Sequence, residues 1–101
     1  MHRLKYLPVA RKDLRNIVSY IADILKAPQA ALDFVDTLDH AITRLQQFPY
    51  SCKVYQPVEP LEVEYRVLPV NNYLVFYRVS AQEIEIHRIV YAKMDLNSIL
   101  L

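Results

Sequence analysis

The first half of the chain contains two runs in which apolar residues recur every three or four positions. The first run begins at Pro8 and the second runs from Pro28 to Phe48, each with polar and charged residues between the apolar ones. This spacing is typical of amphipathic helices that bury one face. We expect the first helix to end near Ala27, because a proline disfavours helical geometry in the residue before it, and the second to end before Pro49.

Extended segments flank this helical pair. Arg3–Leu7 alternates basic and apolar residues, as a half-exposed strand does. An irregular stretch with three prolines follows over residues 49–62. Asn71-Asn72 then separates the first two of three runs rich in β-branched and aromatic residues, and asparagine tolerates the positive φ of a tight hairpin. The three runs predict strands at Val63–Val70, Tyr73–Val79 and Ile84–Tyr91.

The order of these elements, β-α-α-β-β-β, predicts an α+β fold. Two helices joined by a short connection form an antiparallel hairpin, and neither buries enough surface to be stable alone. We therefore expect a mainly antiparallel four-stranded sheet with the helix hairpin packed on one face. A length of 101 residues fits a single domain over residues 1–101.

Composition excludes several classes of site. The chain has no glycine, and phosphate-binding loops, dinucleotide-binding turns and lipase-type nucleophile elbows all require it. Its one cysteine, Cys52, cannot form an internal disulfide or a cysteine-based zinc site and fits a reducing compartment. Because no apolar run is long enough to span a membrane and the N-terminus does not resemble a signal peptide, we expect a cytoplasmic protein.

Charge is unevenly distributed although the formal net charge is +1. Residues 1–20 carry five basic side chains and one acidic one, whereas residues 21–40 carry one basic and four acidic. Separate basic and acidic faces can steer a charged partner, although helices also solvate their outer faces with charge. The histidines His2, His40 and His87 lack the close spacing of metal ligands, so we expect no metal and no cofactor.

Basic and tyrosine side chains alternate along the predicted C-terminal strands, at Arg66, Arg78, Arg88, Tyr91 and Lys93. By alternation, Arg66 shares a face with Leu68, Arg78 with Phe76, and Arg88 with Ile84 and Ile86. Such guanidinium groups need a partner, which is either an internal carboxylate such as Glu64 or Glu85 or an external anion. Arginine with tyrosine suits both RNA and a protein interface. His87 is a further candidate acid or base.

Four segments together resemble one family: "PVARKDLRNIVSYIA", "AITRLQQFP", "YRVLPVNNYLVFYRV" and "EIEIHRIVYAKMDL". In order and spacing they are similar to the RelE/ParE superfamily of type II toxin–antitoxin toxins, also called plasmid-stabilisation or addiction-module toxins. The resemblance implies the fold predicted above, a growth-arresting toxin, and a cognate antitoxin as partner. It also implies docking through Arg11, Lys12, Arg15 and Arg78.

The superfamily has two branches with different targets. RelE-like members cut messenger RNA on the ribosome without a metal, through attack by the RNA 2′-hydroxyl, and the resemblance would give catalytic roles to Arg66, Arg88, Tyr91 and Lys93. ParE-like members inhibit DNA gyrase. Leu68 and Met94 stand where some ribonuclease members have basic residues, and Met94-Asp95-Leu96 resembles the ParE branch. The sequence thus favours gyrase inhibition, with the endoribonuclease as the alternative and a non-toxic interaction module as a third reading.

Overall fold

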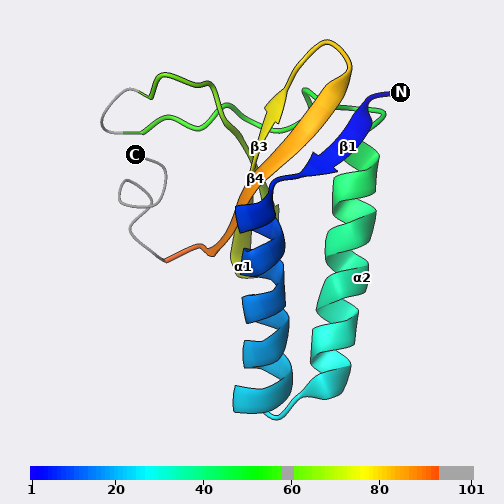
Figure 1. The fold of residues 1–101 in the computed structure, drawn as a ribbon, viewed down its shortest axis with the longest axis vertical. Coiled ribbons are helices and arrows are strands. Elements are labelled where there is room, and N and C mark those ends of the chain that lie inside the picture. The colour runs from blue at the N-terminus through cyan, green and yellow to red at the C-terminus, as the bar shows by residue number, and fades with distance from the viewer. Residues whose placement is uncertain (58–60, 94–101) are drawn as a thin grey trace.

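The computed structural model describes residues 1–57 and 61–93 and has the predicted order of elements (Figure 1). The first of the two predicted helices ends in a short π-helix, η1. The segment Met94-Asp95-Leu96, in which the sequence resembles the ParE branch, lies outside the described residues. The elements are β1 (Arg3–Tyr6), α1 (Pro8–Ser19), η1 (Tyr20–Ile24), α2 (Pro28–Leu45), β2 (Arg66–Val70), β3 (Tyr73–Val79) and β4 (Glu83–Tyr91).

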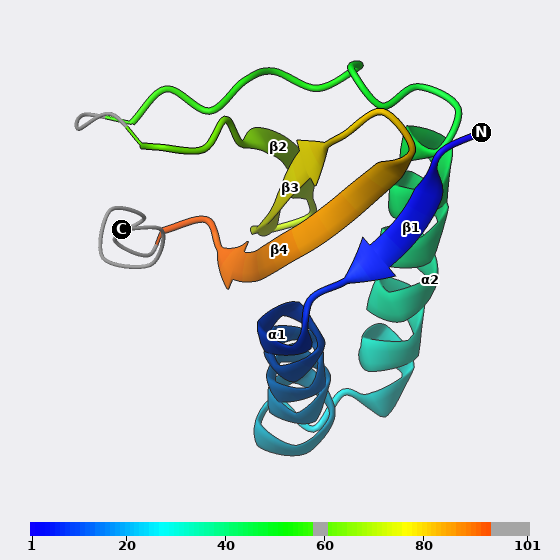
Figure 2. The same ribbon diagram turned by 45° about the horizontal axis from the view of Figure 1, so that its top comes forward.

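The four strands form one mixed sheet in the order β1-β4-β3-β2. β2, β3 and β4 pair antiparallel, and β1 pairs parallel with β4. Both helices lie on the same side of this sheet, and the lower half of the hairpin extends beyond it (Figures 1 and 2). The predicted α+β fold, with its helix hairpin on one face of a mainly antiparallel sheet, is confirmed.

The core lies between the helix hairpin and the sheet. Its residues come from the apolar stripes of both helices and from alternate positions of the strands, as the sequence pattern predicts. Burying each large aliphatic side chain contributes about 1.5–3 kcal/mol to folding. The buried core cluster includes Phe34, Leu38, Ile42 and Leu45 of α2 and Val75, Tyr77, Ile84, Ile86 and Ile89 of the sheet.

The connection between the helices has a lysine at a position whose backbone conformation favours glycine. The Leu25 N–H donates to the Tyr20 carbonyl, and the Ala27 N–H donates to the Ile21 carbonyl, both at 3.0 Å. This wide turn closes with Lys26 at φ 53°, in the left-handed region that favours glycine. The helical structure thus ends close to the predicted end at Ala27. Asn71 also has φ 53°, which confirms the predicted hairpin turn.

The predicted start of β2 and the predicted end of α2 are each wrong by three residues. β2 begins at Arg66, not Val63, because pairing with β3 starts at Arg66. The preceding Tyr65 pairs elsewhere, and its carbonyl accepts a hydrogen bond from the Tyr55 N–H at 2.7 Å. The described residues between α2 and β2 form an arm that extends away from the sheet (Figure 2). α2 ends at Leu45, three residues short of Phe48, where N–H groups at residues 46–48 bond to carbonyls three or four residues earlier in a tightened last turn.

Candidate functional site

Helix α1 closes the part of the β4 edge that β1 leaves open. Among the described residues, β1 pairs with β4 from Glu83 to Ile86 and no further. Beyond that point the Asp13 carboxylate accepts hydrogen bonds from Arg88 Nε at 2.7 Å, from Arg88 Nη2 at 3.0 Å, and from the Ile89 N–H at 3.0 Å. The hydrogen bond to Asp13 raises the pKa of Arg88 above its ordinary value, against the opposing effect of burial. Arg88 therefore has an internal partner on the helix, not Glu64 or Glu85.

A β-bulge changes which face Arg88 occupies. The register runs from Phe76↔Arg88 to Tyr77↔Ile86, so that His87 is the extra residue on β4. Ile86 and Tyr77 belong to the core, whereas Arg88 lies opposite Phe76 on the other face. The prediction that Arg88 shares a face with Ile84 and Ile86 is therefore wrong, because a bulge interrupts simple alternation.

Arg66 lies on the opposite face of the sheet, the one that packs against the helices. It pairs with Tyr77 and so shares that residue's face, as its predicted alternation with Leu68 requires. Its Nη1 donates to the Cys52 carbonyl at 2.7 Å, and its guanidinium carbon lies 5.0 Å from the centre of the Tyr50 ring. Arg66 thus binds the loop that follows α2, with Glu64 3.9 Å away.

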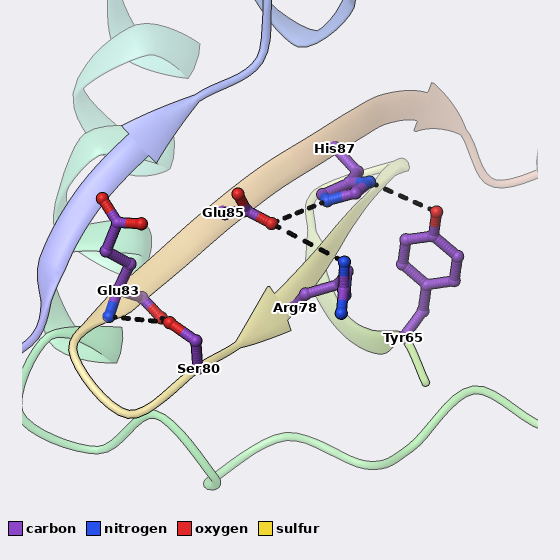
Figure 3. A network of polar contacts seen from close by, with 6 residues as sticks. All are labelled: Tyr65, Arg78, Ser80, Glu83, Glu85 and His87. Carbon is purple, nitrogen blue, oxygen red and sulfur yellow. Dashed lines mark hydrogen bonds and ion pairs between the residues drawn. The ribbon is translucent and has the colours of Figure 1, made fainter. Parts of the chain in front are cut away.

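His87 belongs to a chain of polar contacts on the outer face of the sheet (Figure 3). The Tyr65 hydroxyl lies 3.2 Å from His87 Nδ1, and His87 Nε2 lies 3.3 Å from Glu85 Oε1. Arg78 Nη1 is 3.9 Å from the same Glu85 oxygen. A neutral His87 satisfies both contacts by donating to Glu85 and accepting from Tyr65. The arm holds Tyr65 in place, with its ring edge against Phe76.

A cavity of about 640 Å³ lies between α1, η1 and the ends of β3 and β4, and we call it the α1–β4 groove. Its lining includes the Asp13–Arg88 pair and Tyr73, whose pKa is raised by burial and by the neighbouring phenols of Tyr20 and Tyr91. Several apolar wall residues are half-exposed, and tyrosines of this kind are enriched in protein interfaces. The apolar and aromatic lining comprises Ile17, Tyr20, Leu25, Tyr73, Ile89, Val90 and Tyr91.

The structure places the predicted strand residues of the site at separate positions on the sheet. Arg88 and Tyr91 line the groove, and Lys93 is exposed just beyond β4. Arg66 lies on the helix-side face, and His87 and Arg78 lie on the outer face near the arm. The predicted catalytic set Arg66, Arg88, Tyr91 and Lys93 is therefore not gathered around one point.

The predicted docking residues on α1 share a helix with part of the groove lining, but none of them lines the groove. Arg11, Lys12 and Arg15 are exposed on the helix that supplies Asp13 and Ile17 to the groove. The sequence analysis did not identify Asp13, Tyr20 or Tyr73 as residues of the groove. The one available signal was that Asp13 is the single acidic residue among the first twenty.

The described residues contain no group of three or more His, Cys, Asp or Glu side chains placed to hold a metal ion. Within the same part of the chain, no helix is both long and apolar enough to cross a membrane.

Comparison with known families decides the identity. The family model for the ParE toxin of the type II toxin–antitoxin system, parDE, matches residues 4–96. The chain belongs to the ParE family. The "Chromosomal ParDE TA system from P. aeruginosa" contains a similar chain, with a TM-score of 0.74 and 27% identity, covering 92% of this chain and 98% of that one. A search of curated proteins found no significant match.

The ParE fold is shared with more distant toxins. The E. coli DinJ–YafQ complex contains a chain with a TM-score of 0.61 and 12% identity, covering 90% of this chain and 93% of that one. At this identity the likeness concerns the fold alone. The expected RelE/ParE resemblance is confirmed, and membership of the ParE family makes this chain a type II toxin–antitoxin toxin and does not favour the RelE-like alternative.

Proposed function

We propose that this ParE-family toxin arrests bacterial growth by inhibiting DNA gyrase and that a cognate antitoxin neutralises it. The family match over residues 4–96 and the similar chain in a ParDE system support a ParE-like activity with an antitoxin partner. Gyrase is the target that the sequence resemblance implies for this branch.

The observation that carries the choice between the branches is the Asp13–Arg88 pair. Cleavage of RNA by its own 2′-hydroxyl needs a proton acceptor and several cationic groups around one phosphate. Arg88 instead donates two hydrogen bonds to Asp13, and Arg66 binds a loop carbonyl on the other face of the sheet. This division supports a toxin that acts by binding over one that cuts RNA.

We place the antitoxin in the α1–β4 groove. Its lining is apolar and aromatic, and the exposed basic residues Arg11, Lys12 and Arg15 lie on the same helix. The complementary partner is an amphipathic segment with acidic residues beside its apolar stripe, which folds as it binds. Arg78 lies on the outer face, so a long antitoxin segment would have to pass around the sheet to reach it.

One specific observation favours RNA cleavage as the second candidate. His87 lies between the Tyr65 hydroxyl and the Glu85 carboxylate, an arrangement that can orient a histidine to move a proton. Adding the purified chain to a cell-free translation reaction and mapping message ends tests this directly. Cuts that disappear in His87→Gln would support the nuclease, whereas intact messages would remove it.

The experiment that tests the proposed function is induced expression in a bacterial host. We expect growth to stop on induction and to resume when the antitoxin encoded beside the gene is expressed with it. Normal growth on induction of a folded, soluble chain would overturn the toxin assignment. Arrest without rescue would overturn the proposed partner.

A further inference from the structure

We propose that Arg88 binds a carboxylate of the docked antitoxin in the α1–β4 groove while Asp13 holds the guanidinium in position. This inference rests on the proposed function, since the antitoxin is the occupant. It assigns to Arg88 a binding role and to Asp13 a positioning role.

The geometry leaves part of the guanidinium available. An arginine side chain has five N–H donors in a planar fork. The Asp13 carboxylate accepts from the Nε–H and from one N–H of Nη2 of Arg88. Within the described residues, no hydrogen bond involves Arg88 Nη1. The Arg88 side chain is 27% exposed and lines the groove, whereas Asp13 is 13% exposed. The remaining donors can therefore meet a partner without the Asp13 contacts being broken.

The surroundings strengthen such a contact. Apolar walls lower the local dielectric constant, so a charge-assisted hydrogen bond is stronger there than in water. Because Asp13 already fixes the fork, the partner does not have to immobilise a flexible arginine, and less affinity is lost in ordering.

The lining selects a protein carboxylate over a nucleic acid. The Asp13 carboxylate offsets the single positive charge of Arg88, so the groove offers one oriented donor group and no dense positive field. Tyr20, Tyr73 and Leu25 around it need apolar contact. An acidic residue within an apolar segment supplies both, whereas a phosphate backbone brings repeated charge against apolar walls.

A matched pair of variants separates binding from structure. Arg88→Gln and Asp13→Asn break the same ion pair, but only the first removes the cation, and the amide oxygen in the second can still accept from the Ile89 N–H. Calorimetric titration with the purified antitoxin encoded beside this gene should show the Kd rising roughly 10- to 100-fold for Arg88→Gln. We expect Asp13→Asn to raise it by no more than about threefold and Arg44→Gln, on α2 outside the groove, to leave it unchanged.

The bound carboxylate is found by replacing each Asp and Glu of the antitoxin with its amide. One replacement should weaken binding to the wild-type toxin but have no further effect on Arg88→Gln. Equal weakening by Arg88→Gln and Asp13→Asn, or the absence of a coupled carboxylate, would overturn this inference and leave the antitoxin assignment intact. An antitoxin that does not bind the wild-type toxin would overturn both.

Discussion

Asp13 of α1 and Arg88 of β4 form a two-point ion pair across 75 residues of sequence, with contacts of 2.7 and 3.0 Å. The same carboxylate accepts the Ile89 N–H, as a neighbouring strand would. The pair therefore links the helix hairpin to the strand edge that β1 does not reach, and both residues line the α1–β4 groove.

Removing this carboxylate should destabilise the fold. Asp13→Ala leaves the Arg88 guanidinium and the Ile89 N–H without their acceptor, and we expect a loss of about 2–3 kcal/mol in the free energy of unfolding. Urea titration followed by circular dichroism measures it. The matched control is Asp36→Ala, on the exposed face of α2, which should stay within about 0.5 kcal/mol of wild type. Equal effects of the two variants would contradict the role given to Asp13.

Glycine at position 26 should stabilise a chain that has none. Lys26 has φ 53° at the end of the helical segment, where a side chain is disfavoured. We expect Lys26→Gly to raise the free energy of unfolding by about 0.5–1 kcal/mol, seen as a higher Tm. Lys26→Ala keeps a Cβ atom and should give no gain. A gain from alanine equal to that from glycine would point to removal of the lysine charge instead of relief of backbone strain.

Alkaline pH should weaken the fold through Tyr77. Burial raises the pKa of Tyr77 above its ordinary value, and interaction with Cys52 raises it further by a smaller amount. A raised folded-state pKa means that the stabilisation is complete below about pH 10, the ordinary tyrosine pKa, and is lost as pH rises further.

Tyr77→Phe isolates this effect. At pH 7 it removes the hydrogen bond to the Pro49 carbonyl and should cost about 1 kcal/mol. Above pH 10 its stability should fall less steeply than that of wild type, measured by urea titration at a series of pH values. Parallel curves for the two proteins would show that Tyr77 does not contribute to the alkaline transition.

Charge reversal on α1 should weaken antitoxin binding. Replacing Arg11, Lys12 and Arg15 together with glutamate places acidic groups on the helix that forms one side of the groove, where they repel an acidic antitoxin segment. We expect a lower association rate that no longer falls as salt is added, because exposed charges mainly steer encounter and salt screens repulsion as well as attraction. Surface plasmon resonance at several salt concentrations measures both. Arg44→Glu, on α2 outside the groove, should change neither, and an equal effect there would argue against docking beside α1.

Much of the fold follows from local pattern, but the site does not. The apolar spacing after Pro8 and Pro28 predicts the helices, and Asn71 predicts the hairpin turn. The bulge at His87 could not be predicted, because the prediction of faces assumes that each strand residue pairs with one residue of its neighbour, whereas a bulge adds an extra residue. The partner of Arg88 was missed because Asp13 is distant in sequence and adjacent only after the helix packs on the sheet.

The groove depends on tertiary structure in the same way. Tyr20, Tyr73 and Tyr91 come from three separate elements, and no spacing within any one of them indicates a shared surface. Arg66 likewise binds the Cys52 carbonyl, which the sequence reading placed in an irregular connection.

A DNA supercoiling assay with purified gyrase tests the central claim most directly. The purified chain, added to gyrase, ATP and relaxed plasmid, should block the formation of supercoiled plasmid in proportion to its concentration. An equimolar amount of the antitoxin should restore activity. Unchanged supercoiling in the presence of a preparation that arrests growth in cells would contradict the account.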